Sequence, residues 1–245
     1  MRGAILLLAI CATPAAAQDR SMQTLWFIQE APAPADERDL AGGDFVLKQR
    51  VLPSGLAELS IAATIGKVTL AAGTQLVEVK TQGARVYCEA GIAKQKLLGH
   101  AQLCLVDGDS DGRFDGQFRT TSQTKGLLTI GGNRPKNPKS VPPIAYAQVD
   151  PATMRERFFV GIERRNFFNI YSLESFMIAF GREGELDRIT APVNFKSTEM
   201  PKEVEILGAR FTALSEANGK MRVRVSAAMP AQPFGIVKTT SYSFY

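Results

Sequence analysis

The strongest structural signal in the sequence is the stretch Ser215-Glu216-Ala217-Asn218-Gly219-Lys220-Met221-Arg222-Val223-Arg224-Val225. In its second half apolar residues alternate with cations, as in a strand with one buried face and one face in water. Asn218-Gly219 readily adopts the positive φ angles of a tight hairpin turn. Together with residues 203–214 before it, the stretch predicts an antiparallel hairpin whose charged side is solvated.

Other short runs of branched residues, bounded by Gly, Pro or Ser, also predict strands. They are residues 45–51, 59–63, 67–70 and 76–80. Residues 155–162 and 164–171 look like two more strands around a turn, with aromatic residues in the core and exposed arginines. The sequence therefore predicts an all-β fold, organised as a sandwich or a barrel-like antiparallel domain.

One short helix is predicted at residues 173–180. Its apolar members, which would share one helical face, are Leu173, Phe176, Met177 and Phe180. Gly181 follows as a possible stop signal.

The chain of 245 residues begins like a secretory signal peptide. Met1-Arg2 is positively charged, Ala4 to Cys11 is apolar, and Ala15-Ala16-Ala17 offers the small residues that precede signal cleavage. Residues 1–17 are thus expected to be removed, which leaves 228 residues and lowers the formal net charge from +5 to +4. The expected location is the periplasm or the extracellular space. A lipid anchor at Cys11 is the alternative, but Ile10 is bulky where such a signal needs a small residue.

Two further segments follow this signal. Residues 18–43 contain a short apolar run and then Pro32 and Pro34, a spacing typical of an extended spacer, so this segment is expected to be loosely ordered. Residues 44–245 show no composition shift or repeat and are expected to form a single β domain.

Composition and charge exclude several classes of protein. No apolar run approaches the roughly 20 residues of a membrane-spanning helix, and one His and three Cys leave little material for a zinc site. The terminal residues 241–245 suggest an outer-membrane barrel, but serines occupy the positions where lipid-facing residues are needed, so the chain is not expected to span a membrane. Basic and aromatic residues interleave in residues 155–171, yet behind a signal peptide nucleic acid is not an expected partner.

Cysteine usage predicts a disulfide. If Cys11 leaves with the signal peptide, Cys88 and Cys104 remain as a pair in an oxidising compartment. Their bridge would close a loop of about 17 residues and contribute roughly 3 kcal/mol by the chain-entropy model. Two reduced, buried thiols are the alternative.

The residues with the clearest chemistry are Asp107-Gly108-Asp109-Ser110-Asp111-Gly112-Arg113-Phe114-Asp115. Carboxylates alternate along this stretch, and Gly112 allows a sharp turn that folds several oxygens inward. A hard cation such as Ca²⁺ needs several oxygen ligands at about 2.3 to 2.6 Å. Without a cation, four carboxylates this close together would repel one another. Phe114 is expected to anchor the loop in the core.

This stretch resembles the Asp-x-Asp-x-Asp-Gly calcium loops of EF-hands and dockerins, over a small part of the chain. The resemblance implies a set of metal ligands: Asp107, Asp109, Asp111, the Arg113 carbonyl and Asp115. Phe118 departs from the pattern, because it replaces the bidentate acidic ligand at the last position, which predicts weak calcium affinity of about 10⁻⁴ to 10⁻³ M. Glu89 is a candidate to complete the shell, since Cys88 beside it is expected to bond to Cys104.

An Asp- and Gly-rich turn that caps its own backbone is the alternative to a calcium site. The flanking residues look β-stranded rather than helical, so an EF-hand domain is not expected. The cysteine close to an acidic loop is also similar to uncharacterised secreted proteins of Gram-negative bacteria, a resemblance that implies no activity.

Catalysis is not the leading expectation. His100 is the one histidine of the chain and lies between Gly99 and Ala101 in an expected loop, where a solvated histidine is commoner than a catalytic base. The expected function is a structural or binding role with calcium. The alternative is a cell-envelope hydrolase that acts on glycan or peptide, because two carboxylates suffice for a glycosidase.

Overall fold

The computed structural model describes residues 20–90, 95–96, 99–122, 133–166 and 173–235. The expected signal peptide with Cys11 and the C-terminal residues 241–245 lie outside these ranges. The described chain is all-β, as the sequence predicts, and its helical content is two short 3-10 turns, η1 (Pro151–Thr153) and η2 (Ser197–Glu199). No helix in the described ranges has the length and apolar character to cross a membrane.

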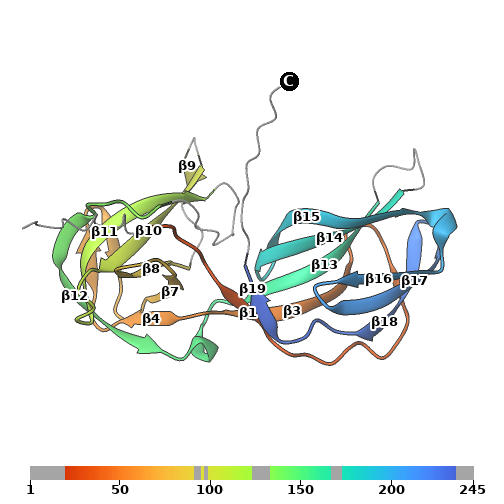
Figure 1. The fold of residues 1–245 in the computed structure, drawn as a ribbon, viewed down its shortest axis with the longest axis horizontal. Coiled ribbons are helices and arrows are strands. Elements are labelled where there is room, and N and C mark those ends of the chain that lie inside the picture. Colours follow the sequence, from red (N-terminus) through yellow and green to blue (C-terminus); the bar gives the residue numbers. More distant parts are fainter. Residues whose placement is uncertain (1–19, 91–94, 97–98, 123–132, 167–172, 236–245) are drawn as a thin grey trace, which may run out of the picture.

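Six strands between residues 56 and 149 form a closed antiparallel barrel (Figure 1). Their order is β11 (Arg113–Ser122), β12 (Lys139–Val149), β4 (Leu56–Leu59), β7 (Gln75–Val79), β8 (Arg85–Glu89) and β10 (Gly99–Asp107), and β10 pairs with β11 to close the ring. The short β9 (Gln95–Lys96) pairs with β10, and β5 (Ala63–Ile65) forms a small hairpin with β6 (Val68–Leu70). The predicted strand at residues 59–63 is thus divided between β4 and β5.

All six barrel strands and the small hairpin contribute to one cluster of buried residues. Its members are Ala57, Leu59, Ile65, Leu70, Leu76, Tyr87, Leu103, Leu105, Phe114, Ile144 and Tyr146. Because every strand of the closed ring contributes, this cluster fills the space where the strands face one another.

Two sheets form a sandwich from the rest of the chain. The six-stranded sheet has the order β15 (Glu185–Lys196), β14 (Leu173–Arg182), β13 (Phe158–Asn166), β3 (Phe45–Pro53), β1 (Trp26–Ile28) and β19 (Gln232–Phe234). The four-stranded sheet has the order β16 (Lys202–Ile206), β17 (Ala209–Ala217), β18 (Lys220–Ala227) and β2 (Arg38–Leu40). The buried rings of Phe176 and Phe211 meet edge to face between the sheets, with centroids 4.8 Å apart.

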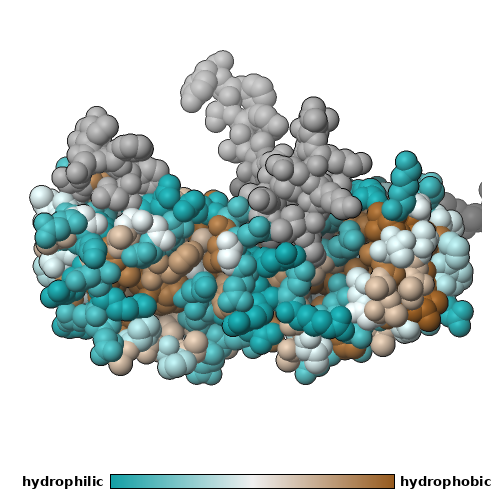
Figure 2. All heavy atoms as spheres, turned by 180° about the vertical axis from the view of Figure 1, so that it is seen from behind, coloured by the Kyte–Doolittle hydropathy of each residue, from teal (hydrophilic) through white to brown (hydrophobic). Residues whose placement is uncertain are grey.

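The sequence predicts a sandwich or a barrel in one domain, and the structure contains both arrangements side by side (Figure 1). The chain enters the barrel after β3 and returns to the sandwich after β12. One continuous core cluster includes Leu56 and Val86 of the barrel together with Phe158 of the sandwich. Seen from behind, hydrophobic residues reach the surface over both parts, and the visible surface between them is mostly hydrophilic (Figure 2).

The hairpin expected near the C-terminus is confirmed as β17 and β18. Its turn residues Asn218 and Gly219 have φ angles of 53° and 75°, and the apolar residues of β18 are buried while its cations are exposed. Residues 203–214, expected as one segment, are two strands instead, because Leu207 and Gly208 also adopt positive φ angles and turn the chain from β16 into β17.

The predicted helix at residues 173–180 is wrong, because these residues belong to strand β14. β14 lies between β13 and β15, and residues on both of its faces are buried, including Phe176, Ala179 and Phe180. Its pairing with β15 also contains register shifts near Ile178. Apolar residues therefore recur with a spacing that imitates one helical face.

Two other expectations differ from the structure. Residues 18–43, expected to be loosely ordered, contribute β1 and β2 to the sandwich, and Trp26 is buried between Phe158 and Phe180. The arginines of residues 155–165 are not all exposed, because Arg164 is fully buried in an ion pair with Glu174.

Candidate metal centre

The acidic stretch is the connection between two paired strands of the barrel. Asp107 is the last residue of β10, Arg113 is the first of β11, and the strands are in continuous register from His100 opposite Ser122 to Val106 opposite Gly116. Ser110 and Gly112 have positive φ angles, which reverse the chain sharply. Because the turn joins neighbouring barrel strands, both of its ends are fixed.

The turn brings three of the expected ligands together. Carboxylate oxygens of Asp107, Asp109 and Asp111 all lie within 4.8 Å of one another. Asp107 is buried, whereas Asp109 and Asp111 are exposed, so the group opens to solvent on one side. A set of carboxylate oxygens suits hard divalent cations, and this triad could hold a metal ion.

Backbone amides of the turn orient these carboxylates. Asp107 accepts hydrogen bonds from the amides of Asp111 and Gly112, each at 3.2 Å. The Asp109 carboxylate also accepts from the Asp111 amide at 3.2 Å, and Asp111 accepts from the Arg113 amide at 2.8 Å. These are the bonds of an Asp-rich turn that caps its own backbone. Capping alone leaves the three like charges close together, which a cation would offset.

The two remaining ligands expected from the resemblance are not placed in the triad. Asp115 lies across the turn from Gly108, whose amide donates to its carboxylate at 3.3 Å. The Arg113 backbone N–H donates a hydrogen bond to the Asp111 carboxylate, but among the described contacts none joins the Arg113 carbonyl to the three carboxylates. Phe118, at the position of the missing acidic ligand, packs against the core opposite Cys104.

The core side of the site contains a partner that the sequence does not reveal. The Tyr146 hydroxyl of β12 donates to the second oxygen of Asp107 at 2.7 Å. Burial, and then this hydrogen bond, raise the pKa of Tyr146 well above its usual range. Phe114 anchors the loop as expected, since it is fully buried and stacks on the Tyr146 ring at 4.1 Å. Asp107 is therefore fixed from inside the barrel.

The predicted disulfide is present near the turn. Cys88 of β8 and Cys104 of β10 lie opposite each other, are fully buried and are joined by an S–S bond of 2.01 Å.

The expectation that Glu89 completes the metal shell is wrong. Asp107 pairs with Arg85, so Glu89 lies four residues further along β8, roughly 13 Å away at strand spacing, and its carboxylate accepts from the Leu103 amide.

The backbone of His100 lies in strand β10, opposite Ser122 and Gln95, and not in the expected loop.

No family model matches the chain, and comparisons with curated proteins and with solved structures found no match either.

Proposed function

We propose that this chain is a secreted or periplasmic calcium-binding protein with a structural or ligand-binding role. The observation that carries the proposal is the approach of three carboxylates, from Asp107, Asp109 and Asp111, to within 4.8 Å at a turn with fixed ends. Ca²⁺ accepts irregular sets of oxygen ligands and water, whereas Mg²⁺ demands near-ideal octahedral geometry. The Arg113 carbonyl, Asp115 and water are the further ligands in this proposal.

The setting of the turn supports a structural effect of the ion. Asp107 is tied to Tyr146 of β12 by its hydrogen bond, and the turn joins β10 to β11, so an ion there connects three consecutive strands of the ring. The Cys88–Cys104 disulfide supports an oxidising compartment. With few protein ligands, the expected dissociation constant is about 10⁻⁴ to 10⁻³ M.

Calorimetry and thermal unfolding of the mature chain with Ca²⁺ test this proposal. We expect saturable heat and a raised melting temperature at millimolar Ca²⁺, because an ion that binds only the folded state stabilises it. Asp109→Asn removes one charged ligand from the exposed side and is expected to weaken binding about tenfold or more. Asp36→Asn, at an exposed position outside the turn, is the matched control and should bind like the parent chain. Absence of heat and of any melting shift in the parent chain would overturn the proposal.

A further inference from the structure

A groove of about 280 Å³ in the sandwich follows one edge of strand β3. Residues on both faces of β3 line it, because Leu47 and Gln49 are buried inside the sandwich whereas Lys48 is exposed on the opposite face. β13 already pairs with the other edge of β3 along residues 45–51. The groove therefore lies along the edge that β13 leaves open.

Strand β1 covers only the last part of this open edge. It pairs with residues 51–53 of β3, and the Gln29 amide adds one bond to the Arg50 carbonyl at 2.9 Å. The chain then leaves β3, and Pro32 and Pro34, which also line the groove, have no N–H to donate. The segment after β1 therefore does not continue the ladder that β1 begins.

Lys48 carries the free backbone groups of this edge. In an antiparallel sheet, every second residue of a strand directs its N–H and C=O to the same side. Because the Arg50 carbonyl faces β1, the N–H and C=O of Lys48, two residues earlier, face the groove. On the β13 side Lys48 lies opposite Gly161, by the same alternation as a pair without hydrogen bonds. The groove thus offers one donor and one acceptor of an open strand edge.

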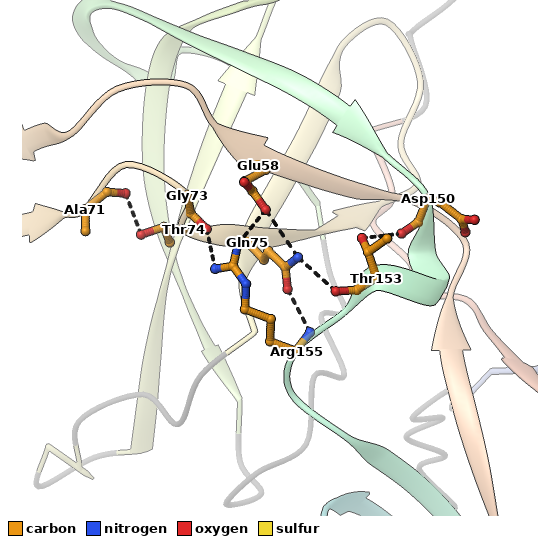
Figure 3. A network of polar contacts seen from close by, with 8 residues as sticks. All are labelled: Glu58, Ala71, Gly73, Thr74, Gln75, Asp150, Thr153 and Arg155. Atoms are coloured by element: carbon orange, nitrogen blue, oxygen red, sulfur yellow. Dashed lines mark hydrogen bonds and ion pairs between the residues drawn. The ribbon is translucent and has the colours of Figure 1, made fainter.

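Arg38 lies at the end of the open edge that is farther from β1. Its guanidinium donates to the Val46 carbonyl and lines the groove. Arg155, at the junction with the barrel, shows the usual arrangement, because it pairs with the Glu58 carboxylate at 2.7 Å (Figure 3). Within the part of the chain that the structure describes, no ion pair of this kind includes Arg38.

The acidic residues beside Arg38 in the sequence do not neutralise it. Glu37 and Asp39 flank Arg38, and successive side chains of an extended chain point to opposite sides. Their carboxylates bind Arg224 and Arg222 of β18. A guanidinium has five N–H donors, so Arg38 keeps donors for an anion that enters the groove.

We propose that this groove binds the C-terminal end of an extended peptide from a partner protein, which adds to β3 as a short antiparallel strand. β1 is antiparallel to β3 and stops at Arg50, so a peptide that continues in the same direction reaches Arg38 with its C-terminus. Its terminal carboxylate then meets the free donors of Arg38, whereas Arg38 would repel the ammonium group of a peptide in the opposite direction. Lys48 supplies the two backbone bonds of the added strand.

Titration of the mature chain with three tripeptides, followed by amide NMR shifts, tests the proposal. They are acetyl-Val-Thr-Val with a free carboxylate, the same peptide as its C-terminal amide, and the free acid with N-methyl groups on its last two residues. β-branched residues suit a strand, and N-methylation removes the donors of the peptide. We expect saturable binding of the free acid with a shift of the Lys48 amide, binding about tenfold or more weaker for the C-terminal amide, and none for the N-methylated acid.

Two substitutions separate Arg38 from general effects of charge. Arg38→Gln keeps a donor for the Val46 carbonyl but removes the charge, and should lower the affinity for the free acid to that for the C-terminal amide. Arg210→Gln removes an exposed cation of β17 that does not line the groove, and should leave binding unchanged. No binding of the free acid, equal binding of any two of the three peptides when the free acid is one of them, or unchanged affinity in Arg38→Gln would each overturn the proposal.

Discussion

The buried side chain of Arg164 connects several strands of the sandwich through an ion pair and hydrogen bonds. Its side chain has no exposed surface, and Nε and Nη2 each donate to Glu174 at 2.9 Å. Nη1 donates to the carbonyls of Leu40 and Gly219, so the same guanidinium joins β13 to β2 and to the turn between β17 and β18. A buried charge is tolerated only while its partners remain, because leaving water costs several kcal/mol per ion.

Removing this guanidinium is expected to destabilise the sandwich severely. Arg164→Met keeps most of the volume but leaves Glu174 buried without its partner, which costs about 3 to 5 kcal/mol. Arg157→Met is the matched control, because Arg157 pairs with Glu183 in an exposed position, where an ion pair contributes about 0 to 1 kcal/mol. Urea unfolding of both variants measures the difference. Equal losses in the two variants would contradict this account of Arg164.

The buried phenol of Tyr87 is expected to make the folded protein less stable as the solution becomes alkaline. Its side chain is buried in the barrel, and this burial, with the nearby charge of Glu78, raises the pKa of the phenol above its usual value. Above about pH 10 the unfolded chain loses this proton while the folded chain keeps it, so stability falls as pH rises. Tyr87→Phe should make this decline shallower above about pH 10, measured by urea unfolding at each pH. A decline as steep as that of the parent chain would exclude Tyr87 as a cause.

At the level of elements, a strand can be recognised from the sequence when one of its faces is buried and the other lies in water. β18 alternates buried and exposed residues, so its pattern alone identifies it. β14 has both faces covered and therefore lacks this alternation, and the spacing of Phe176, Met177 and Phe180 then imitates a helix. Trp26 and its neighbours form too short a strand for any period to be visible in the sequence.

At the candidate site, contacts between neighbours in the sequence are predictable, whereas contacts between distant strands are not. The aspartates of the turn are neighbours in sequence, so their clustering follows from the pattern alone. Tyr146 is 39 residues from Asp107, and its contact depends on the pairing of β11 with β12. The expectation that Glu89 lies at the site is wrong for the same reason. The register of β8 against β10 decides how far Glu89 lies from Asp107, and this register cannot be read from neighbouring residues in the sequence.

The turn between β17 and β18 gives a test of the hairpin. Gly219 has a φ of 75°, a conformation that costs an L-residue roughly 1 to 2 kcal/mol, and a Cβ there would meet nothing within 4 Å. Gly219→Ala should therefore lower the free energy of unfolding by about that amount through the backbone alone. Asn218→Gly is the control and should cost less, because glycine also adopts positive φ angles. Equal stability of parent chain and Gly219→Ala in urea unfolding would contradict this.

For the whole molecule, the central question is whether barrel and sandwich unfold together. Their junction is crossed by a continuous core cluster, and the connecting segment is fixed on both sides, by Arg155 to the barrel and by Glu156 to Arg182 of the sandwich. Domains joined only by a linker lack such a shared core and move independently. The shared core therefore predicts one cooperative unfolding transition.

Trp26 and the disulfide make this prediction measurable. Trp26 is the one tryptophan of the chain and is buried in the sandwich, whereas Cys88 and Cys104 lie in the barrel. Replacing both cysteines by alanine should lower the free energy of unfolding by about 3 kcal/mol, because the unfolded chain gains the freedom of the opened loop.

If the two parts unfold together, Trp26 fluorescence should report the whole of that loss, although no substituted residue belongs to the sandwich. Amide hydrogen exchange in β8 and β10 then serves as the barrel probe, and Gly219→Ala is the reciprocal perturbation from the sandwich side. Cooperative unfolding requires both probes to move together in both variants. A barrel transition that moves while the Trp26 transition stays in place would show instead that the shared core does not couple the two parts.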